Sequence, residues 1–241
     1  MTKEYKYLLF DLDNTLVDDN KNRKYAISKI LNYLNYKYNE ETLNTFILKD
    51  NEYWHKISKK EFDYMRPKNM NKEETFIWAN TNRMKYFFND LPLDTCNNLS
   101  TLYLNSIKEK IFPIDNTIEL LNDLKNNNYK LYIITNGPTE AAINKRNALN
   151  KEFFDNMITS QEIGIMKPHH GFFEAMYKKF NIYNKNKMLI IGDELDKDIL
   201  GGIQEKIDTV WINNNKVNNT TNIKPTYEIS NIKKLKKILI K

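Results

Sequence analysis

Two carboxylates stand two residues apart in the segment Asp11-Leu12-Asp13-Asn14-Thr15, directly after an apolar run. The oxygens of such a pair can share a hard divalent cation. A calcium loop of the helix-loop-helix type is excluded, because its sixth position requires glycine and its twelfth a glutamate, where this chain has Leu16 and Asn22. A polar turn remains the alternative for this segment alone, since Asp and Asn are common turn residues.

Polar groups also follow three other apolar runs. The stretch Thr135 to Gly137 follows a second run, Asp193 follows a third, and Lys167 lies in the loop after a fourth. In an open parallel sheet the ligand crevice lies beyond the carboxyl ends of the strands, so we expect these groups to face one crevice. Taken together, these polar groups favour a ligand site over a set of turn residues without a binding role.

Phosphoryl transfer is the chemistry that needs this combination. A phosphomonoester carries close to two negative charges at neutral pH, so an attacking carboxylate is repelled unless the site supplies positive charge. We predict a Mg²⁺ ion held by Asp11, Asp193 and the backbone carbonyl of Asp13. Lys167 would bind the substrate and supply a second cation.

The remaining groups have predicted roles in the same reaction. Thr135 and the backbone amides around Asn136 and Gly137 would donate hydrogen bonds to the phosphoryl oxygens and so bind the substrate. With the charge offset, Asp11 is predicted to attack in line and form an aspartyl-phosphate. Asp13 would protonate the leaving oxygen and then activate water.

The elements that must position these residues alternate along the chain. Short apolar runs rich in β-forming residues predict buried strands over residues 7–10, 130–134, 157–159, 188–191 and 209–212. Helical patterns separate them, including a helix capped by Asn116 and others over residues 172–180 and 196–204. This alternation predicts an α/β fold with a Rossmann-like parallel sheet core. Apolar residues at helical spacing predict an amphipathic C-terminal helix over residues 229–239.

The segment from residue 19 to residue 94 has a different pattern. It carries aromatic residues at helical spacing, has no convincing buried strand, and is interrupted by Pro67 and Pro92. We predict an all-helical insertion after the first strand. Trp54 and Trp78 could stack on a nucleobase, but an aromatic stripe of this kind is more often core.

Four ordered motifs resemble those of the haloacid dehalogenase (HAD) superfamily. They are Asp11-Leu12-Asp13-Asn14-Thr15, Ile134-Thr135-Asn136-Gly137, Met166-Lys167-Pro168 and Gly192-Asp193 followed by Asp198. The resemblance implies a Rossmann-like core of residues 1–18 and 95–241, with a helical cap of the C1 type over residues 19–94. It also implies Mg²⁺, Asp11 as nucleophile, Asp13 as acid and base, Asp193 as metal ligand, and Asp198 as a supporting acid that orients the lysine. Asp196 competes with Asp198 for that last role.

A finer resemblance concerns the substrate. The segments Glu162–Pro168 and Asp208–Asn213 are similar to those of the YjjG-type pyrimidine 5'-nucleotidases. This implies a nucleoside 5'-monophosphate as substrate. The alternatives on the same core are a sugar-phosphate phosphatase, an N-acylneuraminate-9-phosphate phosphatase or a phosphomutase. A noncatalytic nucleic-acid-binding protein is the alternative of another class.

Composition limits the cellular compartment and the partners of the protein. The chain has 241 residues, a net charge of +6 and one cysteine, Cys96, so an internal disulfide is excluded. No apolar run approaches the roughly 20 residues of a membrane span, and we expect a cytoplasmic protein with no membrane partner. The basic residues are dispersed, so no nucleic-acid partner is expected. The expected partner is a small phosphorylated metabolite, and the protein is expected to be a monomer or homodimer.

For the arginines and two of the histidines, two interpretations are possible. The four arginines, Arg23, Arg66, Arg83 and Arg146, could bind a phosphate or a base edge, but solvated helix faces are the simpler interpretation. His169 and His170 follow Lys167 closely. We expect them to make surface contacts, because an oxygen-lined magnesium site does not need imidazole.

Overall fold

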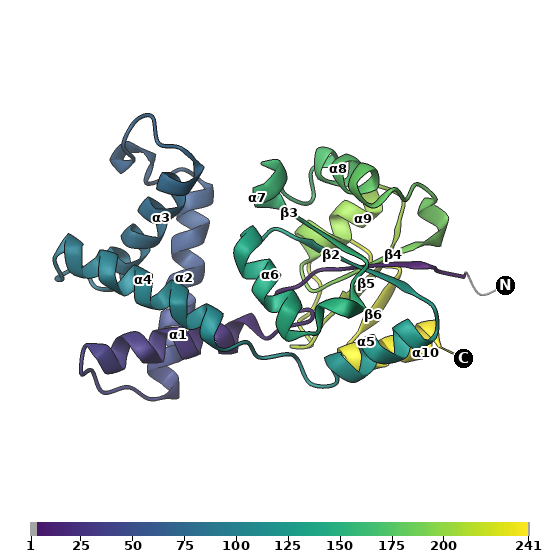
Figure 1. Cartoon of the computed structure of the whole chain (residues 1–241), viewed down its shortest axis with the longest axis horizontal. Helices are drawn as coiled ribbons and strands as arrows, with labels where there is room; N and C mark the ends of the chain where they lie inside the picture. The colour runs from purple at the N-terminus through teal and green to yellow at the C-terminus, as the bar shows by residue number, and fades with distance from the viewer. Residues whose placement is uncertain (1–3, 241) are drawn as a thin grey trace. The chain divides into compact units, whose positions relative to one another are not determined.

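The computed structural model of the chain describes residues 4–240. The chain forms two compact units (Figure 1). The core unit runs from the N-terminal residues to Asp19 and resumes at Ile111, and the inserted unit is Asn20–Lys110. The chain thus leaves the first unit once and returns to it, as a core with one insertion requires.

The core unit is built on a six-stranded parallel sheet with the strand order β3-β2-β1-β4-β5-β6. Its strands are β1 (Tyr7–Phe10), β2 (Lys130–Thr135), β3 (Asn156–Thr159), β4 (Met188–Gly192), β5 (Asp208–Ile212) and β6 (Tyr227–Ile229). Because β1 lies between β2 and β4, its carboxyl end is flanked by theirs. The predicted α/β class with a Rossmann-like parallel sheet is confirmed.

Helices cover both faces of this sheet (Figure 1). They are α5 (Thr117–Asn126), α6 (Thr139–Ala148), α7 (Ser160–Ile163), α8 (His170–Phe180), α9 (Leu200–Gln204) and α10 (Lys236–Leu239), with short turns η2 (Lys151–Phe153), η3 (Lys185–Lys187), η4 (Leu195–Ile199) and η5 (Ile232–Leu235). Alternate strand residues face opposite sides: Leu8 belongs to the apolar cluster that includes α5, and Leu9 to the cluster that includes α8. Asn116 precedes α5 as predicted, but its backbone is left-handed (φ 68°) and its side chain makes no capping hydrogen bond.

The last strand corrects the predicted C-terminal helix. Ile229 ends β6, where it pairs with Ile212 at the sheet edge, so the helical region starts only at η5. Only Ile229 of the three residues of β6 is buried, and so short a strand leaves no apolar run for a sequence pattern to detect. Ile232 and Leu235 still pack on the core, as the amphipathic spacing predicts.

The inserted unit is all-helical, as expected. Its elements are α1 (Asp19–Tyr33), α2 (Glu40–Ser58), the turn η1 (Asp63–Met65), α3 (Lys72–Phe87) and α4 (Leu93–Glu109). The unit extends to Lys110, beyond the end at residue 94 that the sequence predicts. The reason is that Cys96, Leu99 and Tyr103 of α4 share one buried apolar cluster with Met84 of α3. Residues 95–110 therefore belong to the insertion.

Aromatic side chains form much of the core of this unit. Phe46 packs edge-on against Phe87 with ring centroids 5.5 Å apart, and the buried Tyr53 ring stacks on Phe62 at the same separation. Trp54 and Trp78 are half-buried. Phe46, Phe87, Tyr53 and Phe62 thus serve packing, in line with the simpler interpretation of the stripe, whereas Tyr33, Tyr36 and Tyr64 are exposed.

Two of the arginines depart from the predicted solvated helix faces. The Arg83 side chain is 5% exposed, lies over the Tyr103 ring at 3.9 Å, and pairs with Asp50 at 3.6 Å. Arg23 donates to the same carboxylate at 3.0 Å. The buried Asp50 of α2 is therefore linked to both α1 and α3, whereas Arg66 is exposed and bonds Thr75.

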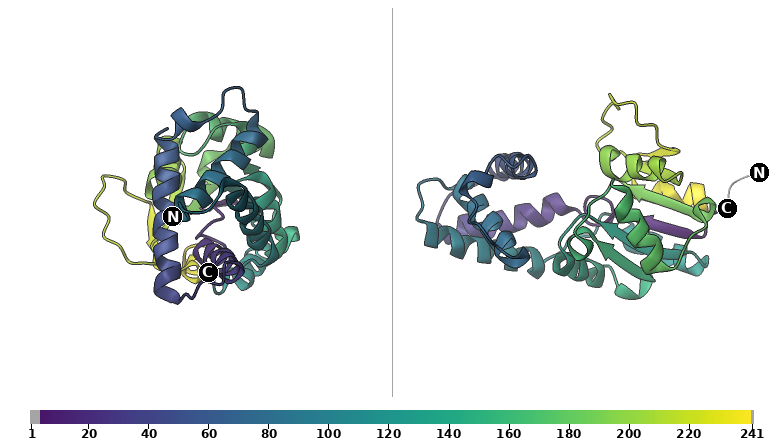
Figure 2. Two further views of the ribbon diagram at one scale, coloured as in Figure 1. Left: turned by 90° about the vertical axis from the view of Figure 1, so that its left-hand side faces the viewer. Right: turned by 90° about the horizontal axis from the view of Figure 1, so that it is seen from above.

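The asparagine-rich stretch 213–222 lies outside the helices and strands and projects from the core unit as a loop (Figure 2). Across residues 4–240, no helix combines the length and the apolar character that crossing a membrane demands.

Candidate active site

The carboxyl ends of β1, β2 and β4 form one edge of the core unit. Phe10 of β1 is in register with Ile133 of β2 and Ile191 of β4. The next residue, Asp11, donates its backbone N–H to the Ile191 carbonyl oxygen at 2.8 Å. Asp11 therefore continues the central strand at the point where the neighbouring strands also end.

The buried ammonium group of Lys167 joins the residues of several motifs. Its Nζ donates to Asp11 Oδ1 at 2.7 Å, to Asp198 Oδ1 at 2.6 Å and to the Ile134 carbonyl oxygen at 2.7 Å. These acceptors use all three ammonium protons. The lysine is thus fixed between two carboxylates, at 3% exposure.

The side chain of Asn136 positions the Lys167 loop. Its Oδ1 accepts the Lys167 backbone N–H at 2.8 Å, and its Nδ2 donates to the Lys167 carbonyl oxygen at 3.1 Å. Ser160 in turn donates to the Asn136 carbonyl oxygen at 2.8 Å. The sequence indicates only substrate contacts for this residue, and the structure adds a positioning function for its side chain.

Three carboxylates meet beside the lysine. Asp11, Asp193 and Asp198 each offer an oxygen atom, and these atoms lie within 4.8 Å of one another. Thr15 Oγ1 donates to Asp193 Oδ1 at 3.2 Å, and Trp211 Nε1 donates to the Asp193 carbonyl oxygen at 2.9 Å. Both the side chain and the backbone of Asp193 are therefore hydrogen-bonded. Asp198 thus lies close enough to the predicted ligands Asp11 and Asp193 to be a further candidate ligand.

A local distortion brings Asp198 into this cluster. The turn η4 is a π-helix, which is often found at functional sites. Within it Asp198 is fully buried while Asp196 is exposed, so the structure favours Asp198 of the two competing acids. A Cβ on Gly192 would lie 2.3 Å from Asp198 Cγ. Glycine at this position therefore allows the carboxylate to approach the end of β4.

The carboxylates have an excess of negative charge. Burial raises the pKa of Asp11 to about 6 and of Asp193 to about 8, and also raises the pKa of Asp198. Burial disfavours the charge of Lys167, yet Asp11 and Asp198 together keep its pKa above the usual value. One ammonium faces three acids, and their oxygen donors suit a hard divalent cation. These residues therefore fit Mg²⁺.

This excess charge predicts a pH dependence of stability. Without metal, the folded protein should become less stable as the pH rises from about 4 to about 8, because the pKa values of Asp11 and Asp193, raised from 3.8, make the folded state bind more protons than the unfolded state; above about pH 6 Asp193 accounts for most of this slope. Thermal unfolding in EDTA measures this slope. Asp193→Asn should flatten the upper part of the curve, and Mg²⁺ should raise the melting temperature most at high pH. An unchanged slope in the variant would contradict the assignment.

The turn after β2 brings further polar groups together. The buried Thr135 hydroxyl accepts the Gly137 backbone N–H at 3.0 Å. A Cβ on Gly137 would lie 3.3 Å from Thr135 Oγ1 and 3.5 Å from Asp13 Oδ2. The turn therefore passes close to the Asp13 carboxylate, and the absence of a side chain at residue 137 leaves room there.

Lys145 of α6 is a site residue that sequence reasoning misses. Its Nζ donates to Asp13 Oδ1 and, at 2.8 Å, to Asp19 Oδ1, and the side chain is 9% exposed. Burial and the nearby Asp19 raise the pKa of Asp13 to about 6, and Lys145 opposes the rise. In a lysine-rich chain, the only sequence signal for the burial of Lys145 is its spacing from Ala142. The two residues are three positions apart and are both buried on one face of α6.

The histidines make contacts outside the carboxylate cluster. His169 Nδ1 accepts the Gly171 backbone N–H at 3.0 Å and caps α8. His170 Nδ1 contacts the buried Glu205 at 2.5 Å. Both histidines are exposed, so these are the surface contacts that the sequence predicts for them.

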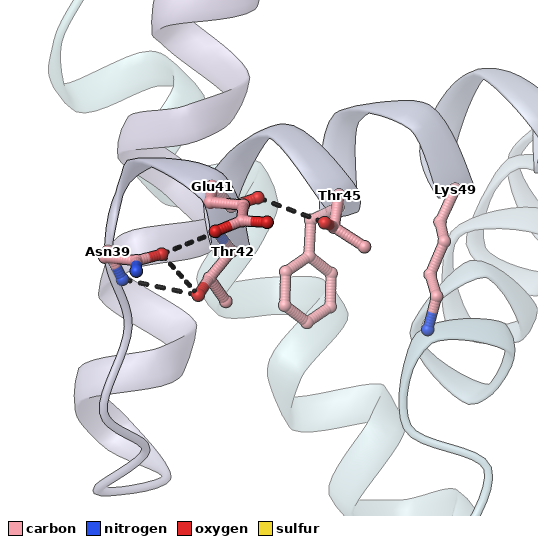
Figure 3. Close-up of a pocket in the computed structure, with 6 residues that line it drawn as sticks. Asn39, Glu41, Thr42, Thr45 and Lys49 are labelled. Atoms are coloured by element: carbon pink, nitrogen blue, oxygen red, sulfur yellow. Dashed lines mark hydrogen bonds between the residues drawn. The ribbon is translucent and has the colours of Figure 1, made fainter.

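A cavity of about 300 Å³ lies on the inserted unit, around the start of α2 (Figure 3). Its polar groups already bond one another: Asn39 Oδ1 accepts the Thr42 backbone N–H at 2.9 Å, and Thr45 Oγ1 donates to the Glu41 carbonyl oxygen at 3.0 Å. None of the four motifs contributes to its lining. We therefore assign it no part in the chemistry.

The fold and the motif geometry agree with comparisons to known proteins. A family model described as haloacid dehalogenase-like hydrolase matches residues 5–204. The chain belongs to this family, and the predicted HAD hydrolase is confirmed.

Curated relatives include two pyrimidine 5'-nucleotidases. PynA of Streptococcus pneumoniae (strain ATCC BAA-255 / R6) is 28% identical over 226 residues, which cover 93% of this chain and 91% of PynA. YjjG of Escherichia coli (strain K12) is 30% identical over 145 residues, which cover 59% of this chain and 64% of YjjG. The resemblance to the YjjG-type group is thus confirmed, and these relatives support a phosphoric monoester hydrolase.

Solved structures share the fold. The putative HAD-hydrolase YfnB from Bacillus subtilis, in a form bound to magnesium, matches with a TM-score of 0.81 at 25% identity, covering 99% of this chain and all of YfnB. A 2-haloacid dehalogenase from Pseudomonas syringae pv. Tomato DC3000 matches with a TM-score of 0.64 at 18% identity, covering 97% of each chain. The second likeness shows the common fold alone.

Proposed function

We propose that this protein is a Mg²⁺-dependent phosphatase that hydrolyses small phosphomonoesters through an aspartyl-phosphate on Asp11. The observation that carries the proposal is the position of the Lys167 ammonium, which contacts both Asp11 and Asp198 beside the Asp193 carboxylate. A nucleophile, a fixed cation and further acids are thus within reach of one small anion. Asp11, Asp193 and Asp198, with the Asp13 carbonyl as predicted, would hold the metal.

The site must first offset the charge of the substrate. Bound Mg²⁺ would neutralise phosphoryl charge and orient the ester. Lys167 adds a fixed positive charge in a buried environment, where electrostatic interactions are stronger than in water. The Thr135 hydroxyl and the Asn136 amide would donate to phosphoryl oxygens, and the Gly137 amide, which donates to Thr135 Oγ1 in this structure, would join them by turning from that acceptor.

In the first step an Asp11 carboxylate oxygen attacks phosphorus, and the ester P–O bond breaks. The electron pair of that bond stays on the leaving oxygen, which takes a proton from the Asp13 carboxyl group. The products are an alcohol and the aspartyl-phosphate. The raised pKa of Asp13, about 6, leaves part of this group protonated near neutral pH.

In the second step the Asp13 carboxylate takes a proton from water, and the resulting hydroxide attacks phosphorus. The P–O bond to Asp11 breaks, the electron pair returns to the Asp11 carboxylate, and inorganic phosphate leaves. Asp13 is protonated again and Asp11 is free, so the two steps restore the starting state.

Among phosphomonoesters, pyrimidine nucleoside 5'-monophosphates are the proposed substrates. The names of PynA and YjjG support this choice, and PynA matches over nearly its whole length. A second candidate is a short sugar phosphate, because a glyceraldehyde 3-phosphate phosphatase of Methanothermobacter thermautotrophicus (strain ATCC 29096 / DSM 1053 / JCM 10044 / NBRC 100330 / Delta H) is 31% identical over 102 residues. That match covers only 42% of this chain and 45% of the relative.

Phosphate release from a substrate panel tests the function and its metal requirement together. We expect release from dUMP, UMP and dTMP with Mg²⁺, loss of activity in EDTA, and recovery when Mg²⁺ is restored. The panel includes purine nucleotides, glyceraldehyde 3-phosphate, hexose phosphates and N-acylneuraminate 9-phosphate. Preference for a sugar phosphate would overturn the nucleotide assignment, isomerised product without phosphate release would indicate a mutase, and undiminished activity in EDTA would overturn the metal assignment.

The inserted unit is proposed to act as the cap that selects the substrate, with Asn20–Lys110 in place of the predicted residues 19–94. The expectations of a cytoplasmic protein, a monomer or homodimer, and no nucleic-acid partner complete the proposal. Salt-dependent binding of DNA or RNA without any phosphatase activity would instead favour the noncatalytic alternative.

A further inference from the structure

Lys145 is a buried cation to which the reaction described above gives no role. It projects from α6, outside the four motifs, and its side chain is 9% exposed. Its ammonium group contacts one oxygen each of Asp13 and Asp19. A buried lysine loses hydration that these contacts must replace, so the carboxylates and the lysine depend on one another.

The two oxygens of Asp13 have different surroundings. Oδ1 accepts the hydrogen bond from Lys145. Oδ2 lies on the side of the turn after β2, 3.5 Å from the position of a Cβ on Gly137, and that position is 3.3 Å from Thr135 Oγ1. The oxygen that Lys145 leaves available is therefore the one beside the proposed phosphoryl-binding turn.

We infer that Lys145 is a positioning residue, which holds Asp13 Oδ1 so that Oδ2 is presented for proton transfer to the leaving group and from water. The inference rests on the proposed function. A carboxylate without this anchor could rotate about its terminal torsion, whose energy profile is broad, and small errors in the position of a reacting group cost up to about 10²-fold in rate.

Asp19 serves as the second anchor of the lysine. Its Oδ1 accepts from Lys145 Nζ at 2.8 Å, and Asp19 is both the last residue of the core unit and the first residue of α1. Because the Lys145 ammonium group also contacts Asp19, it cannot move freely with the Asp13 carboxylate. Lys145 therefore ties the proposed acid and base to a second carboxylate of the core unit.

A purely structural salt bridge is the competing explanation. Two substrates whose leaving groups differ in their need for a proton distinguish it from the positioning role. The alcohol of a nucleoside 5'-monophosphate needs a proton as it leaves, whereas 4-nitrophenolate is stable without one. The constant kcat/KM covers the reaction up to alcohol release. We expect Lys145→Met to lower kcat/KM by about 10²-fold for the nucleotide and by only a few-fold for 4-nitrophenyl phosphate.

Three further variants complete the experiment. Lys145→Arg should recover much of the nucleotide activity, because a guanidinium can also bridge two carboxylates. Asp13→Asn should show the same dependence on the leaving group as Lys145→Met, but a larger one. Lys185→Met, which removes a 2.8 Å contact to the buried Glu205 elsewhere in the core unit, should leave both activities unchanged.

The outcomes separate the inference from the function on which it rests. Equal losses with both substrates in folded Lys145→Met would overturn the positioning role and indicate a structural or purely electrostatic one. If Asp13→Asn itself showed no dependence on the leaving group, the proposed acid role of Asp13 would fail instead. A crystal structure of Lys145→Met provides a readout without turnover: we expect a rotated Asp13 carboxylate, and an unchanged one would also overturn the inference.

Discussion

In Asp11→Asn, phosphate release is expected to fall by about four to six orders of magnitude, the range seen when one member of a catalytic triad is removed. The amide offers no anionic oxygen to attack phosphorus. It should still fit its place at the end of β1, because the two side chains have the same shape. Burial already disfavours the charge that the substitution removes, so the melting temperature should not fall greatly.

Trapping the intermediate tests the same residue directly. Wild-type protein quenched in acid during turnover of a radiolabelled ester should carry labelled phosphate, and Asp11→Asn should carry none. Asp155→Asn is the matched control, because Asp155 pairs with Lys125 and Lys130 outside the carboxylate cluster. Turnover at the wild-type rate in Asp11→Asn would end the proposal of nucleophilic catalysis.

Lys167→Met should impair both stability and activity. The variant leaves Asp11 and Asp198 buried without their shared cation, and removing one partner of a buried pair costs about 3–5 kcal/mol of unfolding free energy. Activity should fall by about 10³-fold, because the site loses the fixed positive charge that offsets the charge of the phosphoryl group. Denaturant unfolding in EDTA measures the first effect, and phosphate release with Mg²⁺ measures the second.

Two comparisons make this result specific. Lys187→Met removes a surface pair with Glu4 and should cost no more than about 1 kcal/mol. Adding Asp198→Asn to Lys167→Met should recover part of the lost stability, because the double variant buries one charge fewer. Additive losses in the double variant would contradict the view that the lysine offsets the buried carboxylates.

The convergence of distant motifs could be predicted because it follows from one rule of parallel sheets. Residues 11, 135 and 193 each follow an apolar run, and the carboxyl ends of parallel strands share one edge. Strand order and register therefore did not need to be known to place these residues together. Their types then limited the chemistry to that of a charged, oxygen-rich ligand.

The parts that were missed depend on tertiary contacts without a local signature. Lys145 contacts Asp13 from α6, and its local sequence hardly distinguishes it from the many other lysines of this chain. Asp198 is predicted as a supporting acid, but its position beside Asp11 and Asp193 depends on a π-helical turn and on the space that Gly192 leaves. The end of the insertion was misplaced since Pro92 suggests a break, whereas α4 begins there and packs on α3.

The true ends of the insertion determine where the protein can be recombined. A replacement of Asn20–Lys110 by the corresponding unit of another hydrolase would leave every residue of the proposed site, including Asp19, in the host chain. A junction at residue 94 would instead divide α4 from its first turn and separate Leu99 and Tyr103 from the apolar partners that bury them. Chimeras designed to transfer substrate preference should therefore join the chains outside α4.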